Sequence, residues 1–430
     1  MINNSYISVG IDVGSSISWM SIVDPQENIV LKPIKITHND INSIERAISE
    51  IKKAEELFSL KSRTFLESTG IYHIPLFCCL IESGFEAYVI NPLITHSIKN
   101  YGIRKVKNDK IDSIGIAKLG LKRDLKTSLM PTKLVLELRS LCRKYYELTD
   151  TRSGYVNRLK KDINTVFPQY LDIFCDVTGK TSIMILKEYP TPDKILRGQK
   201  ITMIEKILKI SKKGITYTNK KYEQLIQAAK ASKIFGCNLD SVYLSISINL
   251  KLIEELDALI SFVFNQIKSL VEANQNEKFI KQINWIDSIP GIGFLSAVTI
   301  MCEIGDFSAF KKPKQLLAYF GIDPTVYQSG NYKSTEVHMS KRGSRIARRA
   351  IFSVAIANIR SNSKGNAINP VLYDYYIKKT ESKPKKVALG AVMHKVCNLI
   401  FAVLRDEKPF ELKSSEEHCL SYKQIILSVA

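Results

Sequence analysis

The order of strand and helix patterns in the first 120 residues is the feature that most constrains the fold. Three runs rich in β-branched residues come first: Ser5–Val13, Ile17–Val23 and Ile29–Ile36. Helical spacing and short strands then alternate: Ile41–Leu57, Arg63–Leu66, Ile74–Ser83, Glu86–Ile90 and Asn108–Leu119. The leading strands need only short hairpins, whereas the later strands need helical crossovers. This is the element order of an RNase H-like α/β fold.

Four carboxylates lie within or at the ends of these predicted strands and in the last predicted helix. Asp12 lies inside an apolar strand, and Glu67 ends the fourth strand, which neighbours the first in an RNase H-like sheet. A charge in such a strand is costly unless it is paired or bound to metal. Asp109 and Asp112 are three residues apart in a predicted helix and share a face. Converging acids of this kind predict a site for Mg²⁺, or Mn²⁺, which prefers hard oxygen ligands.

Each of these acids also has a structural interpretation. Asp109 could merely begin its helix, and Asp112 could pair with Lys110 or Lys118. The position of the whole set favours a metal site, because it combines strand one, strand four and the last helix. Two ions in such a site can clamp the attacking and leaving oxygens of an in-line phosphoryl transfer.

The charge of the chain indicates a polyanionic partner. The 430 residues carry 62 Lys and Arg against 42 Asp and Glu, a net charge of +20. Each phosphate that a basic protein neutralises releases counterions, so this balance favours nucleic acid. Four cations adjoin Asp109 and would hold the backbone of the reacting strand: Arg104, Lys105, Lys107 and Lys110.

The middle of the chain changes to long helical patterns. Apolar residues step by three and four from Leu134 to Leu148 and from Ile253 to Leu270. This spacing predicts a coiled coil, with an ordinary helical bundle as the alternative. We expect an RNase H-like catalytic domain at 1–125, a helical linker for oligomerisation and nucleic-acid contact at 126–280, a mostly helical domain at 281–410 and a tail at 411–430. Eight cysteines without zinc spacing, no signal peptide and no run of transmembrane length favour the cytoplasm.

The C-terminal part contains three further motifs. Pro290–Gly293 predicts a tight turn that opens a helix. The turn is either purely structural or, as in a helix-hairpin-helix element, a phosphate grip in which Gly291 and Gly293 would let backbone N–H groups receive the phosphate. Ser329 is predicted in an exposed turn before Gly330, with Lys333 close behind. A basic helix is then expected, whose cations share faces that can bind phosphate: Lys341, Arg342, Arg345, Arg348 and Arg349.

Together these motifs resemble the DEDD transposases of the insertion sequence 110 family. The matching segments are Gly10–Val13, Glu67–Tyr72, Asn91-Pro92, Lys107–Asp112, Pro290–Gly293, Gly321–Gly330 and Lys341–Arg349. Asn108 departs from the family pattern, in which many relatives carry Thr, and the helical linker is longer than the family leads us to expect.

The resemblance implies a RuvC-like N-terminal domain and a C-terminal transposase domain that bears a catalytic serine. The catalytic residues would be Asp12, Glu67, Asp109, Asp112 and Ser329. Members of the family recombine DNA with a structured guide RNA from their own element, so DNA and RNA are the expected partners. Exchange of two duplexes requires up to four strand cuts, which predicts a homo-oligomer, from a dimer to a tetramer, in the nucleoid of a prokaryote.

Three other functions remain open on the sequence. A metal-dependent nuclease of the Holliday-junction resolvase type would share the carboxylates and need no serine. A non-catalytic nucleic-acid-binding protein would share the charge. An actin-like or sugar-kinase ATPase would share Asp12-Val-Gly-Ser15, but its second Asp-x-Gly turn has only Asp176–Gly179 as a candidate, in a helical region.

Overall fold

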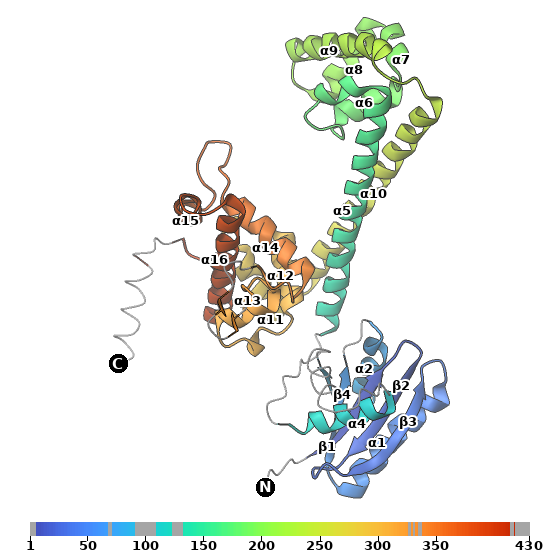
Figure 1. Ribbon diagram of the computed structural model, residues 1–430, viewed down its shortest axis with the longest axis vertical. Coiled ribbons are helices and arrows are strands. Elements are labelled where there is room, and N and C mark those ends of the chain that lie inside the picture. Colours follow the sequence, from blue (N-terminus) through green and yellow to red (C-terminus); the bar gives the residue numbers. More distant parts are fainter. Residues whose placement is uncertain are drawn as a thin grey trace. The chain divides into compact units, whose positions relative to one another are not determined.

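The computed structural model describes residues 6–67, 71–90, 109–122, 132–325, 328–329, 332–333, 338–412 and 417 (Figure 1). For residues 328–329 and 332–333 it describes the backbone alone. The chain divides into two compact units, Met1–Thr132 and Lys133–Ala430, and each is described by itself. The domain boundaries expected at residues 125, 280 and 410 stay predictions.

The first unit is a five-stranded sheet covered by helices. Its elements are β1 (Tyr6–Val13), β2 (Ile17–Val23), β3 (Ile29–Thr37), α1 (Ile41–Phe58), β4 (Lys61–Glu67), α2 (His73–Glu82), β5 (Glu86–Ile90) and α4 (Asp109–Gly120). The strand order is β3-β2-β1-β4-β5, antiparallel from β1 to β3 and parallel from β1 to β5. This confirms the predicted RNase H-like domain, with element ends that differ from the prediction by at most two residues.

The central strand β1 presents two different faces. Ile7, Val9, Ile11 and Val13 point into the main apolar core of this unit. The alternate residues are small or polar and lie under α4, because side chains along a strand alternate between faces. Ser8 Oγ donates to the carbonyl of Ala117 at 2.6 Å, and Tyr6 donates its hydroxyl to the carbonyl of Gly120 at 2.8 Å. Two hydrogen bonds therefore fasten α4 along β1.

Gly10 allows α4 to lie directly on the strand. A Cβ atom at this position would come within 2.2 Å of the Ala117 nitrogen and 2.3 Å of the Ser113 carbonyl oxygen. Only a residue without a side chain permits backbone to approach backbone this closely. Gly10 stands two residues before Asp12 on the same face of β1, so the contact that seats α4 also sets its separation from Asp12.

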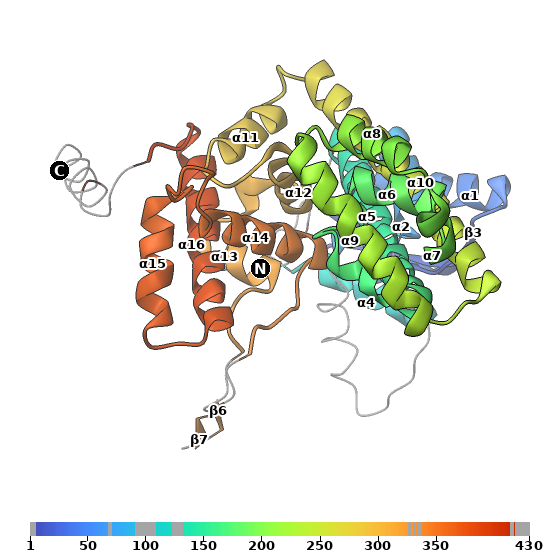
Figure 2. The ribbon, with the colours of Figure 1, turned by 90° about the horizontal axis from the view of Figure 1, so that it is seen from above.

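In the part of the second unit that the structure describes, helices predominate and two short strands occur. Its helices are α5 (Lys133–Val166), α6 (Lys180–Glu188), α7 (Pro192–Arg197), α8 (Lys200–Ser211), α9 (Ile215–Ile234), α10 (Asp240–Ala273), α11 (Lys278–Asp287), α12 (Phe294–Ile304), α13 (Pro313–Phe320), α14 (Arg345–Asn358), α15 (Pro370–Thr380) and α16 (Lys385–Asp406). Single 3₁₀ turns occur at Pro168–Asp172 and Phe307–Ala309. The strands β6 (Gln328–Ser329) and β7 (Tyr332–Lys333) pair antiparallel (Figure 2).

The two longest helices, α5 and α10, pack along each other and end in separate cores. At one end, Leu138 and Ile267 belong to the core formed with helices α11 to α16. At the other end, Ile163 and Ile253 belong to a core formed with α6 to α9. The prediction of two long packed helices is confirmed, whereas a coiled-coil supercoil stays a prediction.

The expectation that no segment reaches transmembrane length was wrong for α16. This helix is long and apolar enough to cross a membrane, by length and composition alone, with a mean hydropathy of 1.9 over its most apolar window. Half of that window is buried, and Val396 and Ile400 pack in the helical core of the second unit. Such burial is typical of the core helix of a globular bundle.

Candidate active site

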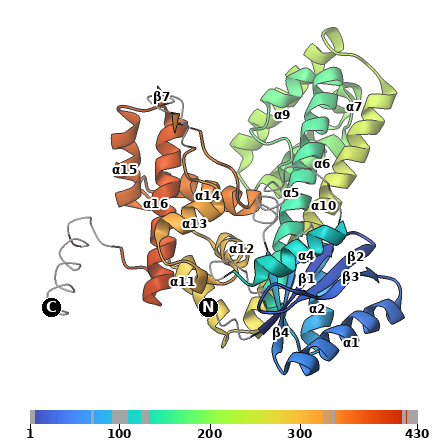
Figure 3. The same ribbon diagram turned by 60° about the horizontal axis from the view of Figure 1, so that its bottom comes forward.

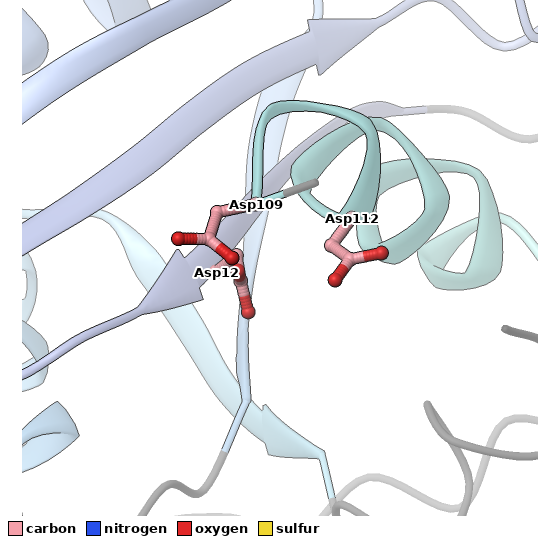
Figure 4. Close-up of side chains that lie close together, drawn as sticks. All are labelled: Asp12, Asp109 and Asp112. Atoms are coloured by element: carbon pink, nitrogen blue, oxygen red, sulfur yellow. The ribbon is translucent and has the colours of Figure 1, made fainter. Parts of the chain in front are cut away.

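Three carboxylates meet where β1 ends and α4 begins. Asp12 comes from β1, and Asp109 and Asp112 come from the first turn of α4. Each offers an oxygen within 4.8 Å of those of the other two. Figure 4 shows the three side chains turned toward the same space. The predicted sharing of a helix face by Asp109 and Asp112, and their approach to Asp12, are thus present in the structure.

The arrangement fits a divalent cation by the chemistry of its donors. Three hard oxygen ligands at this spacing match what Mg²⁺ and Mn²⁺ accept, and their mutual repulsion is relieved by a cation. One oxygen of Asp112, Oδ2, is buried, so this part of the carboxylate is shielded from bulk water. The neighbouring cation Lys110 lies over the ring of Trp19, 4.7 Å from its centroid, on the strand beside β1.

Glu67 lies at the end of β4 but outside this group of three. The parallel register pairs Ile11 with Leu66, so the next residues, Asp12 and Glu67, come level on adjacent strands. The predicted adjacency of the two strands is confirmed. The carboxylate of Glu67 has one buried oxygen, yet it is not among those within 4.8 Å of one another. Its role as a fourth ligand stays a prediction.

Metal titration distinguishes these positions without any measurement of DNA cleavage. Asp112→Asn should weaken Mn²⁺ binding, measured by calorimetry, by roughly 10–100-fold, because a charged ligand of the centre is lost. Glu67→Gln should weaken it less, since Glu67 lies outside the group of three. Equal losses in the two variants would place Glu67 in the same centre, and no loss in either would remove the metal assignment.

Ser329 belongs to a segment whose base is held by backbone hydrogen bonds. Thr325 N donates to the carbonyl of His338 at 2.7 Å, and Ser340 N donates to the carbonyl of Asp323 at 2.9 Å. Ser329 itself ends β6 and pairs with Tyr332 of β7. Ser329 is thus the last residue of a short strand that pairs with the next one, and the exposed turn predicted there stays a prediction. Its side chain, and that of Lys333, lie outside the described residues.

The basic segment after Ser329 is only partly helical. The predicted helix from Lys341 was wrong at its start: Lys341 has φ +55°, and Ser344 caps α14, accepting a hydrogen bond from Ala347 N at 3.1 Å. Lys341 and Arg342 therefore precede the helix, and Arg345 is its first residue. A left-handed φ cannot continue a right-handed helix, which sets the boundary.

Two of the predicted phosphate-binding arginines are held by contacts within the protein. Arg348 Nη1 donates to the carbonyls of Phe320 and Gly343, at 3.1 and 2.7 Å. Burial and the nearby Arg345 lower the pKa of Arg348. Arg349 pairs with Asp150 of α5 at 2.6 Å. Both side chains thus help to position the start of α14, a structural function that the sequence pattern does not reveal.

The other predicted nucleic-acid residues have mixed outcomes. Arg104, Lys105 and Lys107 lie outside the described residues. Gly291 has φ +80° in the turn between α11 and α12, and a Cβ there would meet the Asn358 side chain at 2.5 Å, so packing accounts for this glycine. Gly293 caps α12, and a Cβ there would meet nothing within 4 Å. A phosphate grip at this turn stays a prediction.

Comparison with known proteins matches both ends of the chain to transposases. The DEDD transposase family of IS110 elements, described as "Transposase", matches residues 9–168, and "Transposase IS116/IS110/IS902 family" matches residues 284–369. Together they cover more than half of the chain. The chain belongs to the IS110 family of transposases. The carboxylate cluster lies in the first matched region and Ser329 in the second.

Individual relatives of this transposase agree with the family assignment. An IS116 insertion-element protein of Streptomyces clavuligerus is 22% identical and covers 94% of this chain and 96% of its own length. The pilin gene-inverting protein of Moraxella bovis is 30% identical over 30% of this chain and 38% of its own. The IS1111A transposase of Coxiella burnetii is 32% identical over 22% of this chain and 24% of its own. The transposase is therefore an enzyme that acts on DNA.

Two solved structures of Thermus thermophilus RuvC, one in complex with a Holliday junction substrate, are also similar. They are 10% and 11% identical, with TM-scores of 0.22 and 0.21. They cover 29% and 28% of this chain and 99% of their own. At such scores the fold assignment rests on the strand order β3-β2-β1-β4-β5 alone.

Proposed function

We propose that this transposase cuts and rejoins DNA through Ser329 as nucleophile, assisted by a divalent metal at the carboxylates of β1 and α4. The observation that carries the proposal is the joint presence, in one chain, of the three-carboxylate group and the Ser329 segment, each within a matched region of the family. A nuclease that uses metal and water alone needs only the first of these.

Three further features support a recombinase. The net charge of +20 suits a DNA partner. The backbone hydrogen bonds of Thr325 and Ser340 hold together the two chain positions between which Ser329 lies in the sequence. The pilin gene-inverting protein, a relative over part of the chain, is named for an inversion of DNA, which requires both cutting and rejoining.

The chemistry of strand exchange follows from conserving the phosphodiester bond. The Ser329 oxygen forms a bond to a backbone phosphorus, the bond from that phosphorus to one deoxyribose oxygen breaks, and the serine proton ends on the departing oxygen. Attack by a deoxyribose hydroxyl of the partner duplex reverses these changes and frees the serine. A divalent metal, held by Asp12, Asp109 and Asp112, would stabilise negative charge on the phosphate. Cations that follow Ser329 in the sequence, such as Arg345, would position the backbone.

The assembly and its guide are part of the same proposal. Since exchange of two duplexes requires up to four strand cuts, a homo-oligomer of two to four chains acts, with the helices α5 and α10 as the joining surface. A structured RNA from the element directs the choice of DNA, and the complex works in the nucleoid of a prokaryotic cell.

Sequencing of RNA that copurifies with the full chain tests the guide RNA and should return one structured species. A random sample of cellular RNA would contradict the proposal of a guide RNA.

Trapping the serine–DNA ester tests the nucleophile directly. Wild-type protein, incubated with 5′- or 3′-labelled donor DNA and Mg²⁺ and then denatured, should yield a protein-linked label that resists boiling in detergent. Ser329→Ala should yield none and should lose strand cleavage by roughly 10⁴-fold or more, as removal of a nucleophile does. Ser334→Ala, in the same segment, is the matched control and should retain both activities.

Two results would overturn the proposal. Cleavage by Ser329→Ala at the wild-type rate would identify a metal-dependent nuclease of the resolvase type. Absence of cleavage by the wild-type protein on its own element's ends, with DNA binding intact, would identify a non-catalytic nucleic-acid-binding protein.

A further inference from the structure

An open cavity of about 500 Å³ lies in the second unit, where α14, α16 and α5 come together. α14 and α16 are packed side by side (Figure 3). Five cationic side chains line the cavity: Lys341, Arg345, Arg348, Arg349 and Lys386. The other lining residues, apart from Asp150, are apolar: Met339, Phe352, Gly390 and Met393. A cationic side and an apolar side in one cavity match a ligand that has both an anionic and a flat apolar part.

Three of the five cations have no polar partner within the described part of the protein. Arg348 and Arg349 are engaged by carbonyl oxygens and by Asp150, as described above. Across the described ranges, the side chains of Lys341, Arg345 and Lys386 make no ion pair or hydrogen bond, and all three residues are exposed. This surplus positive charge, concentrated around a single cavity, is a feature typical of a phosphate site.

The placement of these cations opposes local helix stability. Arg345 and Lys386 lie in the first turns of α14 and α16, and neither first turn contains an acidic residue. The beginning of a helix carries positive partial charge, so basic side chains there are unfavourable. Local preferences are usually violated where a function requires the residue. An anion bound in the cavity would relieve both the repulsion among the cations and the conflict with the helix ends.

Gly390 supplies an independent observation on the apolar side. It lies in the interior of α16, where glycine is disfavoured relative to alanine. A Cβ atom at this position would meet nothing within 4 Å, so no contact within the protein requires a glycine. The missing side chain instead leaves space in the cavity that Phe352 also lines, and this residue of α14 is 45% exposed. An exposed aromatic ring beside such space is suited to stacking with a nucleic-acid base.

We propose that this cavity binds one unstacked nucleotide of a single-stranded segment of nucleic acid. Its phosphate lies against Lys341, Arg345 and Lys386, and its base stacks on Phe352 in the space left by Gly390. The inference rests on the proposed function only in taking nucleic acid as the partner. Because duplex DNA keeps its bases stacked, the cavity distinguishes a single strand, DNA or RNA, from a duplex.

Fluorescence anisotropy on the full chain tests the preference for an unstacked base. The probes are labelled 20-nucleotide oligo(dT), 20-nucleotide oligo(rU) and a 20-base-pair dA·dT duplex, all at one salt concentration. Phe352→Ala should weaken binding of the single strands about tenfold, the effect of losing one base–aromatic stack, and leave duplex binding within about twofold. Gly390→Leu should give the same pattern by filling the cavity. If affinity for oligo(dT) and oligo(rU) falls equally, the cavity accepts single-stranded DNA and RNA alike. If affinity for only one of them falls, that nucleic acid is the ligand.

Charge and fold controls complete the experiment. Lys386→Gln should weaken single-strand binding several-fold, whereas Lys385→Gln, the adjacent lysine outside the cavity, should change it by less than twofold. Gly390→Ala should raise the melting temperature by about 2–4 °C, since alanine favours the helix interior. Unchanged single-strand affinity in Phe352→Ala and Gly390→Leu, equal losses on duplex and single strand, or equal effects of the two lysine variants would overturn the proposal. Cleavage is not measured, so failure of the Ser329 chemistry would leave this result intact.

Discussion

Replacement of Asp12 by asparagine should abolish strand cleavage while DNA binding remains. Asp12 is the member of the carboxylate group that comes from the central strand, and its oxygen lies within 4.8 Å of those of Asp109 and Asp112. The amide keeps the shape of the side chain and removes the charge that a divalent cation requires. A loss of several kcal/mol of transition-state stabilisation corresponds to roughly 10³-fold or more in rate. Single-turnover cleavage of labelled donor DNA, with anisotropy on the same DNA, measures both quantities.

A matched acid-to-amide change separates this effect from a general loss of charge. Asp40→Asn, at the start of α1, keeps the cap that accepts a hydrogen bond from Asn42 N, since asparagine caps helices as well as aspartate does. It should cleave at the wild-type rate. Full activity of wild-type protein in EDTA, or cleavage by Asp12→Asn within tenfold of wild type, would contradict a metal role for the carboxylates.

The parts of this site that depend on repeating geometry were predictable from the sequence. Strand order followed from three hairpin-joined runs and two helical crossovers, and the sheet has that order. The spacing of Asp109 and Asp112 placed both on one helix face, because residues three apart are neighbours there. Their meeting with Asp12 then required only that the last helix cover the central strand.

The parts that depend on a single backbone conformation or on distant packing were not predictable. A helix starting at Lys341 has suitable residues, but φ +55° at that position and the Ser344 cap delay it to Arg345. The contribution of α16 to the basic cavity arises from packing between segments about 40 residues apart. By contrast, the alternation of Tyr6, Ser8, Gly10 and Asp12 along β1 was readable as one small and polar face, and it marks where α4 lies.

Gly10→Ala should destabilise the first unit and weaken its metal binding together. A Cβ at Gly10 would fall 2.2 Å from the Ala117 nitrogen and 2.3 Å from the Ser113 carbonyl oxygen, and backbone atoms cannot rotate away as a side chain can. α4 must move off β1, and it carries Asp109 and Asp112 away from Asp12. Overpacking of this kind lowers the free energy of unfolding by about 1–3 kcal/mol. Mn²⁺ affinity should fall at least about tenfold, because metal centres tolerate little displacement of their ligands.

The opposite result is expected for the same substitution at a glycine of α4 itself. A Cβ at Gly115 would meet nothing within 4 Å, so Gly115→Ala should stabilise the helix by up to about 1 kcal/mol and leave Mn²⁺ affinity unchanged. If Gly10→Ala does not fold, Ser8→Ala serves as the milder test. It removes the hydrogen bond to the Ala117 carbonyl and should lower stability by about 1 kcal/mol with a smaller loss of affinity. Denaturant unfolding measures the free energy of unfolding, and calorimetry measures the Mn²⁺ affinity. Stability lost without any change in Mn²⁺ affinity would show that the seating of α4 on β1 does not set the geometry of the carboxylates.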